Sequence, residues 1–231
     1  MKKSNKLLLG GFLTVILLIT GIHVALYAKY KKGDYTIYHE EDRLAGIMQP
    51  FPNVSFVTIR NVYGAKIHFS DRAEIEKDKE DVIQYIQSGD SLIITGRERE
   101  YELDSRPPVN ITLPFNVTLS AFNSVLYFEK GKKLPEINPV IYLSKSQALF
   151  PETYDTFLSG HIKLVASDSS IATFHGNTQV NRLEVQLSHS ALEYGEGDAG
   201  ELSIVTDSIS RISLQSKHLL KANITTAPNK P

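Results

Sequence analysis

The sequence predicts an all-β fold, a parallel β-solenoid with coils of about 20 residues, preceded by one N-terminal transmembrane helix. The main observation is a Ser-x-Ser motif that recurs between short segments in which apolar residues alternate, a pattern typical of half-buried strands. The composition agrees, because Ser, Thr, Asn, Val, Ile and Leu are frequent and tryptophan is absent. A long apolar run near the N-terminus predicts the helix.

The transmembrane helix is predicted over residues 7–28, after a basic tail at residues 1–6. The run reads LLLGGFLTVILLITGIHVALYA, and His23 is its only ionisable side chain, so it can cross a bilayer as a helix. The alternative is a cleaved signal peptide, whose apolar core is shorter and ends at a small-x-small site. The best such site, Leu26 to Ala28, begins with a bulky residue. We therefore expect an uncleaved anchor, with the rest of the chain outside the cytoplasm.

A polar segment broken by glycine and proline follows the anchor, and residues 29–52 are predicted to be a tether. The β-solenoid domain is predicted over residues 53–226, with a C-terminal tail at residues 227–231. The first strands of this domain are predicted where apolar residues are spaced two apart. They are VSFVTIRNV (54–62), AKIHFS (65–70), AEIEK (73–77) and SLIITG (91–96).

Two segments near these strands are predicted to differ from them. Residues 78–90, DKEDVIQYIQSGD, are predicted to form one or two turns of helix through Val82, Ile83 and Ile86. Residues 96–108, GREREYELDSRPP, are predicted to be a solvated loop or edge, because charges are dense and prolines end the segment. The alternative for this second segment is a binding rim.

Four Ser-x-Ser or Thr-x-Ser units follow, and their first hydroxyl residues are 23, 21 and 18 residues apart. Each unit is predicted to be a strand, a small polar corner and a second strand, so that successive units stack and bury alternate side chains. Looser units are predicted at 113–128 and from residue 221. The hydroxyl pairs are Ser144 and Ser146, Ser167 and Ser169, Ser188 and Ser190, and Thr206 and Ser208; the matching apolar positions are Ile141, Leu143, Leu164, Ala166, Val185, Leu187 and Val205, then Phe150, Thr173, Tyr194 and Ile212.

One unit, LVASDSSIATFHGN, also contains the residue types of a hydrolase site in Asp168, Ser169, Ser170 and His175. A catalytic nucleophile occurs once, whereas this serine recurs in every unit, as a repeated backbone bend requires. We therefore predict a structural role for the motif and no catalytic residue. The middle positions of the units are chemically diverse and are expected to face solvent; they are Lys145, Asp168, His189 and Asp207.

The segment ASDSSIATFHGNTQVNRLEVQLSHSALEYGEG (166–197) resembles the head-GIN-domain family, described as autotransporter adhesins, whose repeat is Ser-Gly-Ala-Ser-like sequence between apolar strands. Residues 57–96 resemble the opening block of that family, and the resemblance spans most of residues 53–226. It implies a right-handed β-solenoid at the cell surface or in the periplasm of bacteria, with no established enzymatic role. The glycine of the family's corner is replaced here, which indicates a divergent member; the replacing residues are Lys145, Asp168, His189 and Asp207.

Composition and spacing argue against several other classes. A formal net charge of -1 gives no basic excess for a nucleic-acid partner. The chain has no cysteine, so disulfides, thiolate zinc sites and cysteine nucleophiles are excluded. We predict no cofactor, because no phosphate-binding or dinucleotide fingerprint is present, and no metal, because the histidines lack ligand spacing. A calcium loop is the alternative for the acids around three glycines, which are Glu193, Glu196, Asp198 and Glu201.

The sequence therefore predicts a membrane-anchored, extracytoplasmic binding or structural module of a bacterial cell envelope, adhesin-like and not an enzyme. Its expected partners are the membrane and a surface protein or glycan. A carbohydrate-active enzyme on the same scaffold is one alternative, although Asp104, Glu129 and Asp155 show no spacing that brings two carboxylates together. An envelope sensing or assembly component is the other.

Overall fold

The computed structural model describes residues 3–31, 48–76, 83–96, 109–129, 136–150, 157–176 and 178–227. The chain divides into two compact units, residues 1–45 and 46–231. The first contains helix α1 (Lys3–Lys31). The second contains the strands and the short helix α3 (Ser216–Leu219).

Three polar side chains of helix α1 contact its own backbone. The hydroxyls of Thr14 and Thr20 donate to carbonyl groups one turn earlier, and His23 Nδ1 lies 2.8 Å from the carbonyl oxygen of Ile19. In the described part of the chain, no helix is both long enough and apolar enough to cross a membrane. The large hydrophobic side chains that α1 exposes are Phe12, Leu13, Val15, Ile16, Leu17, Leu18, Ile19, Ile22, Val24 and Tyr27.

The second unit is mostly β structure and consists of two nine-stranded sheets, here called sheet A and sheet B. In spatial order, sheet A contains β1 (Met48–Phe51), β4 (Ala73–Glu76), β7 (Val109–Pro114), β3 (Tyr63–Ser70), β9 (Val125–Phe128), β11 (Gln147–Phe150), β13 (Ile171–Phe174), β15 (Ala191–Tyr194) and β17 (Arg211–Leu214). Sheet B contains β18 (Ala222–Thr226), β16 (Asp198–Thr206), β14 (Thr178–Leu187), β12 (Phe157–Ser167), β10 (Val140–Ser144), β8 (Thr118–Phe122), β2 (Phe56–Arg60), β6 (Ser91–Gly96) and β5 (Ile83–Ser88). The all-β prediction is confirmed.

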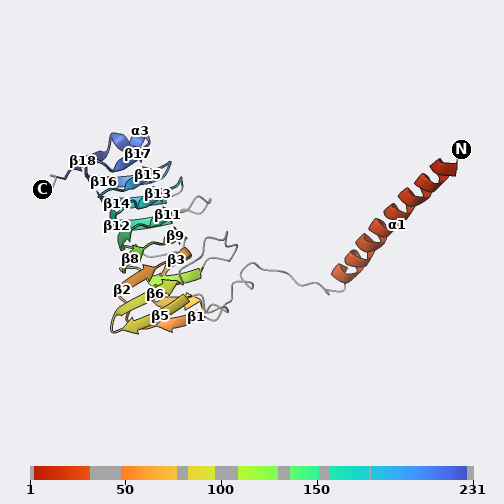
Figure 1. Cartoon of the computed structure of the whole chain (residues 1–231), viewed down its shortest axis with the longest axis horizontal. Coiled ribbons are helices and arrows are strands. Elements are labelled where there is room, and N and C mark those ends of the chain that lie inside the picture. The colour runs from red at the N-terminus through yellow and green to blue at the C-terminus, as the bar shows by residue number, and fades with distance from the viewer. Residues whose placement is uncertain are drawn as a thin grey trace. The chain divides into compact units, whose positions relative to one another are not determined.

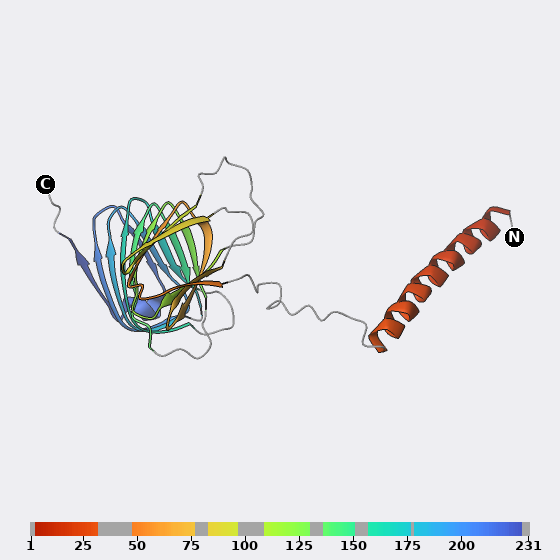
Figure 2. The same ribbon diagram turned by 90° about the horizontal axis from the view of Figure 1, so that it is seen from below.

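From β8 onward the chain alternates between the two sheets. Each sheet B strand from β8 to β16 is followed by a sheet A strand, and we call such a pair a rung. Every strand of a rung pairs in parallel with the corresponding strand of the next rung. Figure 1 shows the strands following one another along the stack, and Figure 2 shows the rungs lying one behind another.

The parallel register places like residues on like residues and so builds the core. In sheet B, Leu164 pairs with Ile141 on one side and with Val185 on the other, and all three are at most 3% exposed. In sheet A, Phe150 pairs with Phe174, which pairs with Tyr194. These columns exist because alternate residues of a strand point to the same face. The predicted core positions Leu143, Ala166, Leu187 and Phe150 are confirmed as buried.

The N-terminal rungs do not stack in chain order. The rung β2–β3 lies between β6–β7 and β8–β9, so the first rung in sequence has a later rung on each side. Beyond β6–β7, strands β1, β4 and β5 run antiparallel to their neighbours. Gly96 permits one close approach there, because a Cβ atom at this position would lie 2.2 Å from the carbonyl oxygen of Asn61.

Two predictions for this region are wrong. The helix predicted over residues 78–90 is strand β5 in its described part, since Ile83 and Tyr85 turn inward while Ile86 is 68% exposed. The tether predicted over residues 29–52 includes strand β1, which pairs with β4. The loop predicted over residues 96–108 lies outside the described residues except for Gly96, which ends β6.

Candidate functional site

The corners between sheet B and sheet A contain a ladder of buried serines. At four steps of the ladder, a serine hydroxyl accepts a hydrogen bond from the backbone N–H of the residue at the same position in the preceding rung. The N–H of Ser170 donates instead to the carbonyl oxygen of Ser167. Four of the serines also donate to a carbonyl oxygen two or three residues earlier in their own corner. The bonds between rungs are Val62 N to Ser124 Oγ (3.1 Å), Ser124 N to Ser146 Oγ (3.2 Å), Ser146 N to Ser170 Oγ (3.2 Å) and Ser190 N to Ser210 Oγ (3.1 Å); those within a corner are Ser124 Oγ to Phe122, Ser146 Oγ to Ser144, Ser170 Oγ to Ser167 and Ser190 Oγ to Ser188.

The ladder corrects the predicted register in two units. Ser170, which is 0% exposed, occupies the ladder position that was predicted for Ser169. Ser210 occupies the position predicted for Ser208. The reason is that these two corners are each one residue longer than the corners that contain Ser146 and Ser190, while the residue immediately before the sheet A strand keeps its place in the ladder.

The same shift moves some predicted core positions by one residue. Thr206, and not Val205, pairs with the buried Leu187, and Thr206 is 9% exposed. Phe174, and not Thr173, continues the aromatic column of Phe150. The strand-corner-strand pattern of the sequence is therefore correct in kind, and its register is wrong in the units with long corners.

A second column of the corner has left-handed backbone conformation. Its members have φ values between 47° and 55°; they are Asn61 (55°), Asn123 (47°), Lys145 (50°), Asp168 (55°) and His189 (52°). A residue with a Cβ atom is disfavoured in this conformation, and glycine is the usual occupant. Each corner of this column therefore carries local backbone strain.

The residues of the hydrolase motif are not brought together. Asp168 accepts hydrogen bonds from Ser144 and Ser167, while Ser170 is buried in the serine ladder. His175 follows the far end of strand β13. The four residues of β13 separate it from Ser170, and five steps at the usual rise of a strand correspond to roughly 16 Å. These residues therefore form no catalytic group.

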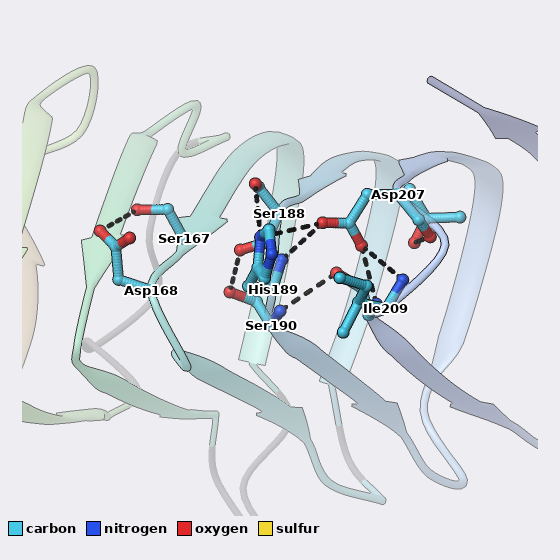
Figure 3. Close-up of polar contacts among 9 residues, drawn as sticks. Ser167, Asp168, Ser188, His189, Ser190, Asp207 and Ile209 are labelled. Atoms are coloured by element: carbon cyan, nitrogen blue, oxygen red, sulfur yellow. Dashed lines mark hydrogen bonds and ion pairs between the residues drawn. The ribbon is translucent and has the colours of Figure 1, made fainter. Parts of the chain in front are cut away.

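A different Ser-His-Asp cluster lies on the exposed corner (Figure 3), formed by Ser188, His189 and Asp207. His189 Nδ1 is 3.4 Å from Ser188 Oγ and 3.3 Å from Asp207 Oδ2. In a catalytic triad the serine and the acid contact opposite nitrogens of the histidine ring. One nitrogen accepts the proton of the serine, while the N–H of the other donates to the acid. Here both contact the same nitrogen, so the cluster cannot relay a proton from the serine.

Asp207 instead organises its own corner. Its Oδ1 accepts the backbone N–H groups of Ile209 (3.1 Å) and Ser210 (2.7 Å), and its Oδ2 accepts the N–H of His189 (2.7 Å) in the preceding rung. The hydrogen bond to the Ser210 side chain and those to the backbone hold the pKa of Asp207 well below its usual range. Hydrogen bonds from Ser144 and Ser167 likewise lower the pKa of Asp168. The hydrogen bonds that link neighbouring corners therefore keep both carboxylates charged.

The acids of the glycine segment do not converge: two of them contact cations of the next rung, and Glu201 contacts Arg182 of the preceding rung at 3.8 Å. Glu193 contacts Arg211 at 2.9 Å, and Asp198 contacts Lys221 at 3.6 Å. The glycine at 197 is required by packing, since a Cβ atom there would lie 2.4 Å from the carbonyl oxygen of Thr178. Within the described ranges, no group of three His, Asp or Glu side chains could hold a metal ion.

The acids considered for an enzyme are only partly described. Glu129 contacts Lys66 at 3.0 Å and His68 at 3.6 Å. Asp104 and Asp155 lie outside the described residues. The one described acid therefore belongs to an ion-pair cluster on sheet A.

An exposed apolar surface on sheet B is the feature that sequence reasoning missed. Five large side chains on the outer face of β2, β5, β6, β8 and β10 are 37% to 68% exposed, while alternate residues of these strands are buried. In one lateral row, Ile86 pairs with Ile93, Ile93 with Thr58, Thr58 with Ser120, and Ser120 with Tyr142. We call this surface the outer patch; it consists of Phe56, Ile86, Ile93, Phe122 and Tyr142.

The outer patch has a floor of small hydroxyl residues between large ones. Thr58 and Ser120 lie side by side, with Ile93 next to Thr58 and Tyr142 next to Ser120. Arg60 extends over Phe122, with its Cζ atom 5.7 Å from the ring centroid. Exposed apolar residues of this kind, accompanied by aromatic and arginine side chains, are typical of recognition surfaces.

The comparison with known proteins gives no family for this chain. No protein-family model matches it, and no curated protein sequence matches it.

Proposed function

We propose that the protein is a membrane-attached parallel β-solenoid of a bacterial cell envelope that binds a surface protein or a glycan through the outer patch and catalyses no reaction. The observation that carries the proposal is the outer patch itself. Its five large apolar side chains are exposed on strands whose inner faces are packed in the core. Rigid strands hold the patch in one arrangement, which reduces the entropy lost on binding.

The solenoid architecture is supported by the rungs from β8 to β17. Parallel pairing between rungs, a serine at each corner and continuous core columns are the features that a solenoid repeats. The resemblance to the head-GIN-domain family supports the right-handed form and the location outside the cytoplasm.

Membrane attachment is supported by the composition of residues 7–28, in which His23 is the only ionisable side chain. Consecutive large apolar residues such as Ile16, Leu17 and Leu18 are exposed around α1. Exposed apolar side chains in such a run favour an apolar environment. Carbonate extraction of membranes, with mass measurement of the N-terminus, tests attachment and cleavage separately. Release of the chain by carbonate would contradict the anchor.

The binding role is tested with two tyrosines of nearly equal exposure on opposite sheets. Tyr142 belongs to the outer patch and is 41% exposed, whereas Tyr127 lies on sheet A and is 42% exposed. A photo-crosslinking amino acid is placed at one position or the other in the full chain in cells. We expect adducts with an envelope protein or glycan from position 142. Equal adducts from both positions, or adducts from position 127 alone, would contradict the proposal.

A glycan array distinguishes the two classes of ligand. The full chain in mild detergent is applied as wild type, as Tyr142→Ser and as Tyr127→Ser. Binding that is lost only with Tyr142→Ser identifies a glycan, because the ring supplies the stacking surface. Crosslinking at position 142 to a protein, without binding on the array, identifies a protein partner.

A further inference from the structure

The two ends of the stack are finished differently. At the N-terminal end, Phe51 of β1 and Tyr85 of β5 come from opposite sheets and meet edge to face, with ring centroids 5.2 Å apart. The hydroxyl of Tyr85 donates to the side chain of Gln49. Phe51 is 6% exposed. This pair therefore closes the core between the last strands of the two sheets.

At the C-terminal end, the core columns stop without such closure. Ile224 continues the column of Ile204, but it is 43% exposed while Ile204 is 0% exposed. Helix α3 covers one position, where His218 packs against Tyr194 with ring centroids 4.7 Å apart. Further apolar side chains around this end are also exposed; they are Ile209 (67%), Leu219 (55%) and Leu220 (90%).

The last strand of sheet B also lacks the usual protection of an edge. Among the described strands, β18 pairs with β16 alone. Its residues, Ala222–Thr226, include no charged residue and no proline, whereas the edge strand β1 contains Pro50. Natural edge strands usually carry charges or proline, because an unprotected edge can pair with another strand.

The described cations near this end do not oppose association. Arg211 points back to Glu193 of the preceding rung at 2.9 Å, and Lys221 points back to Asp198 at 3.6 Å. Lys217 Nζ donates to the carbonyl oxygen of Glu196 at 2.5 Å. Because each charge is directed toward the preceding rung, two such ends can approach without strong repulsion between like charges.

We propose that a second copy of this chain covers the C-terminal end, through antiparallel pairing of β18 with β18 of the other copy. The sequence ANITT is self-complementary in this arrangement. With Ile224 on the two-fold axis, Ala222 of one copy lies opposite Thr226 of the other, and Asn223 lies opposite Thr225. No charged residue faces another, and the two isoleucines cover each other. The interface is isologous, so it closes at two copies and does not continue into a filament.

The absence of cysteine from the chain makes a direct test possible. Directly opposed residues of an antiparallel pair have Cβ atoms about 5 Å apart, so an Ile224→Cys variant at the two-fold axis can form a disulfide with its copy. The full chain in mild detergent is oxidised and the mass of the product is measured. The matched control is Ile86→Cys, which is more exposed but lies at the other end of sheet B. We expect dimers from Ile224→Cys and monomers from Ile86→Cys.

A second variant tests association without a covalent bond. Ile224→Lys places two like charges at the axis, and we expect it to raise the dissociation constant of the dimer by about tenfold or more. The control Ile86→Lys should leave the dissociation constant unchanged. Sedimentation over a range of protein concentrations measures both. A chain that stays monomeric at every concentration would overturn the proposal. A variant with cysteine at both positions 224 and 86 gives a further test, because a disulfide between position 224 of one copy and position 86 of the other indicates head-to-tail contact. That result would also overturn the proposal.

The dimer and the proposed binding role can fail independently. The outer patch lies on β2, β5, β6, β8 and β10, whereas the dimer uses β18 at the opposite edge of sheet B. Variants at Tyr142 should therefore leave sedimentation unchanged, and variants at Ile224 should leave crosslinking from the patch unchanged.

Discussion

The rings of Phe150 and Phe174 stack with centroids 4.1 Å apart and planes at 6° to each other. Phe128 stacks on Phe150 at 4.5 Å and Tyr194 on Phe174 at 5.1 Å, so one aromatic column crosses four rungs of sheet A. Because each ring is held by the ring of the neighbouring rung, the column links the stability of one rung to that of the next.

Removing one ring should therefore be costly. We expect Phe174→Ala to lower the free energy of unfolding by about 3 to 5 kcal/mol, since it leaves a cavity between two stacked rings. Urea unfolding of the full chain in detergent, followed by circular dichroism, measures the change. Tyr127→Ala is the control, because its ring is 42% exposed on the outside of the same sheet. Similar losses from both variants would contradict the inward column.

The serine ladder distinguishes two adjacent serines of one corner. Ser170→Ala removes the acceptor for the backbone N–H of Ser146, which is 1% exposed. We expect a loss of about 1 to 3 kcal/mol, the usual cost of leaving a buried polar group without a partner. Ser169→Ala, at an exposed position, should change stability by less than about 0.5 kcal/mol. The same urea measurement decides, and a larger loss from Ser169→Ala would restore the register that the spacing alone predicts.

The left-handed corner column predicts a stabilising substitution. Lys145 has φ of 50° and is exposed, so glycine there relieves backbone strain without removing packed side-chain atoms. We expect Lys145→Gly to raise the free energy of unfolding by about 1 kcal/mol. At Lys163, an exposed position within strand β12, glycine should instead lower it by about 0.5 to 1 kcal/mol. Opposite signs for the two variants are the result that supports the column.

The sequence predicts the repeating part of the fold because the information there is local. Alternation in each unit places Leu164 and Val185 inside, and the polar corners mark where each strand ends. The register is harder to predict, because Ser167, Ser169 and Ser170 are equivalent in a spacing argument. Only the hydrogen bond from Ser146 in the preceding rung selects Ser170.

The remaining features depend on contacts between distant segments. The position of β2–β3 between β6–β7 and β8–β9 is set by pairing across many residues, which no local pattern encodes. Strand β5 has a spacing compatible with a helix and becomes a strand by pairing with β6. In the outer patch, exposed Phe56 and Phe122 have the same residue types as buried positions, so their facing follows only from the sheet. Propensity is a weak guide when tertiary pairing decides.

Acid should weaken the C-terminal cap through His218. Burial, together with the positive charge of Lys217 beside it, lowers the pKa of His218, while hydrogen bonds with the backbone of Gly197 and Gly195 and the charge of Asp198 act in the opposite direction. The folded chain therefore binds this proton less readily than the unfolded chain, in which histidine titrates near 6.5. Protonation of His218 therefore has no effect on the free energy of unfolding well above pH 6.5, and that free energy falls as the pH drops below this value.

The substitution His218→Phe isolates this contribution. Phenylalanine keeps a ring against Tyr194 but has no proton to gain, so the variant should lose less stability than the wild type when the pH falls from about 7.5 to about 5.5. Asp168 and Asp207, whose pKa values are lowered, lose their contributions at lower pH in both proteins and cancel in the difference. Urea midpoints at each pH give the two curves. Parallel curves would show that protonation of His218 does not limit the stability of the cap.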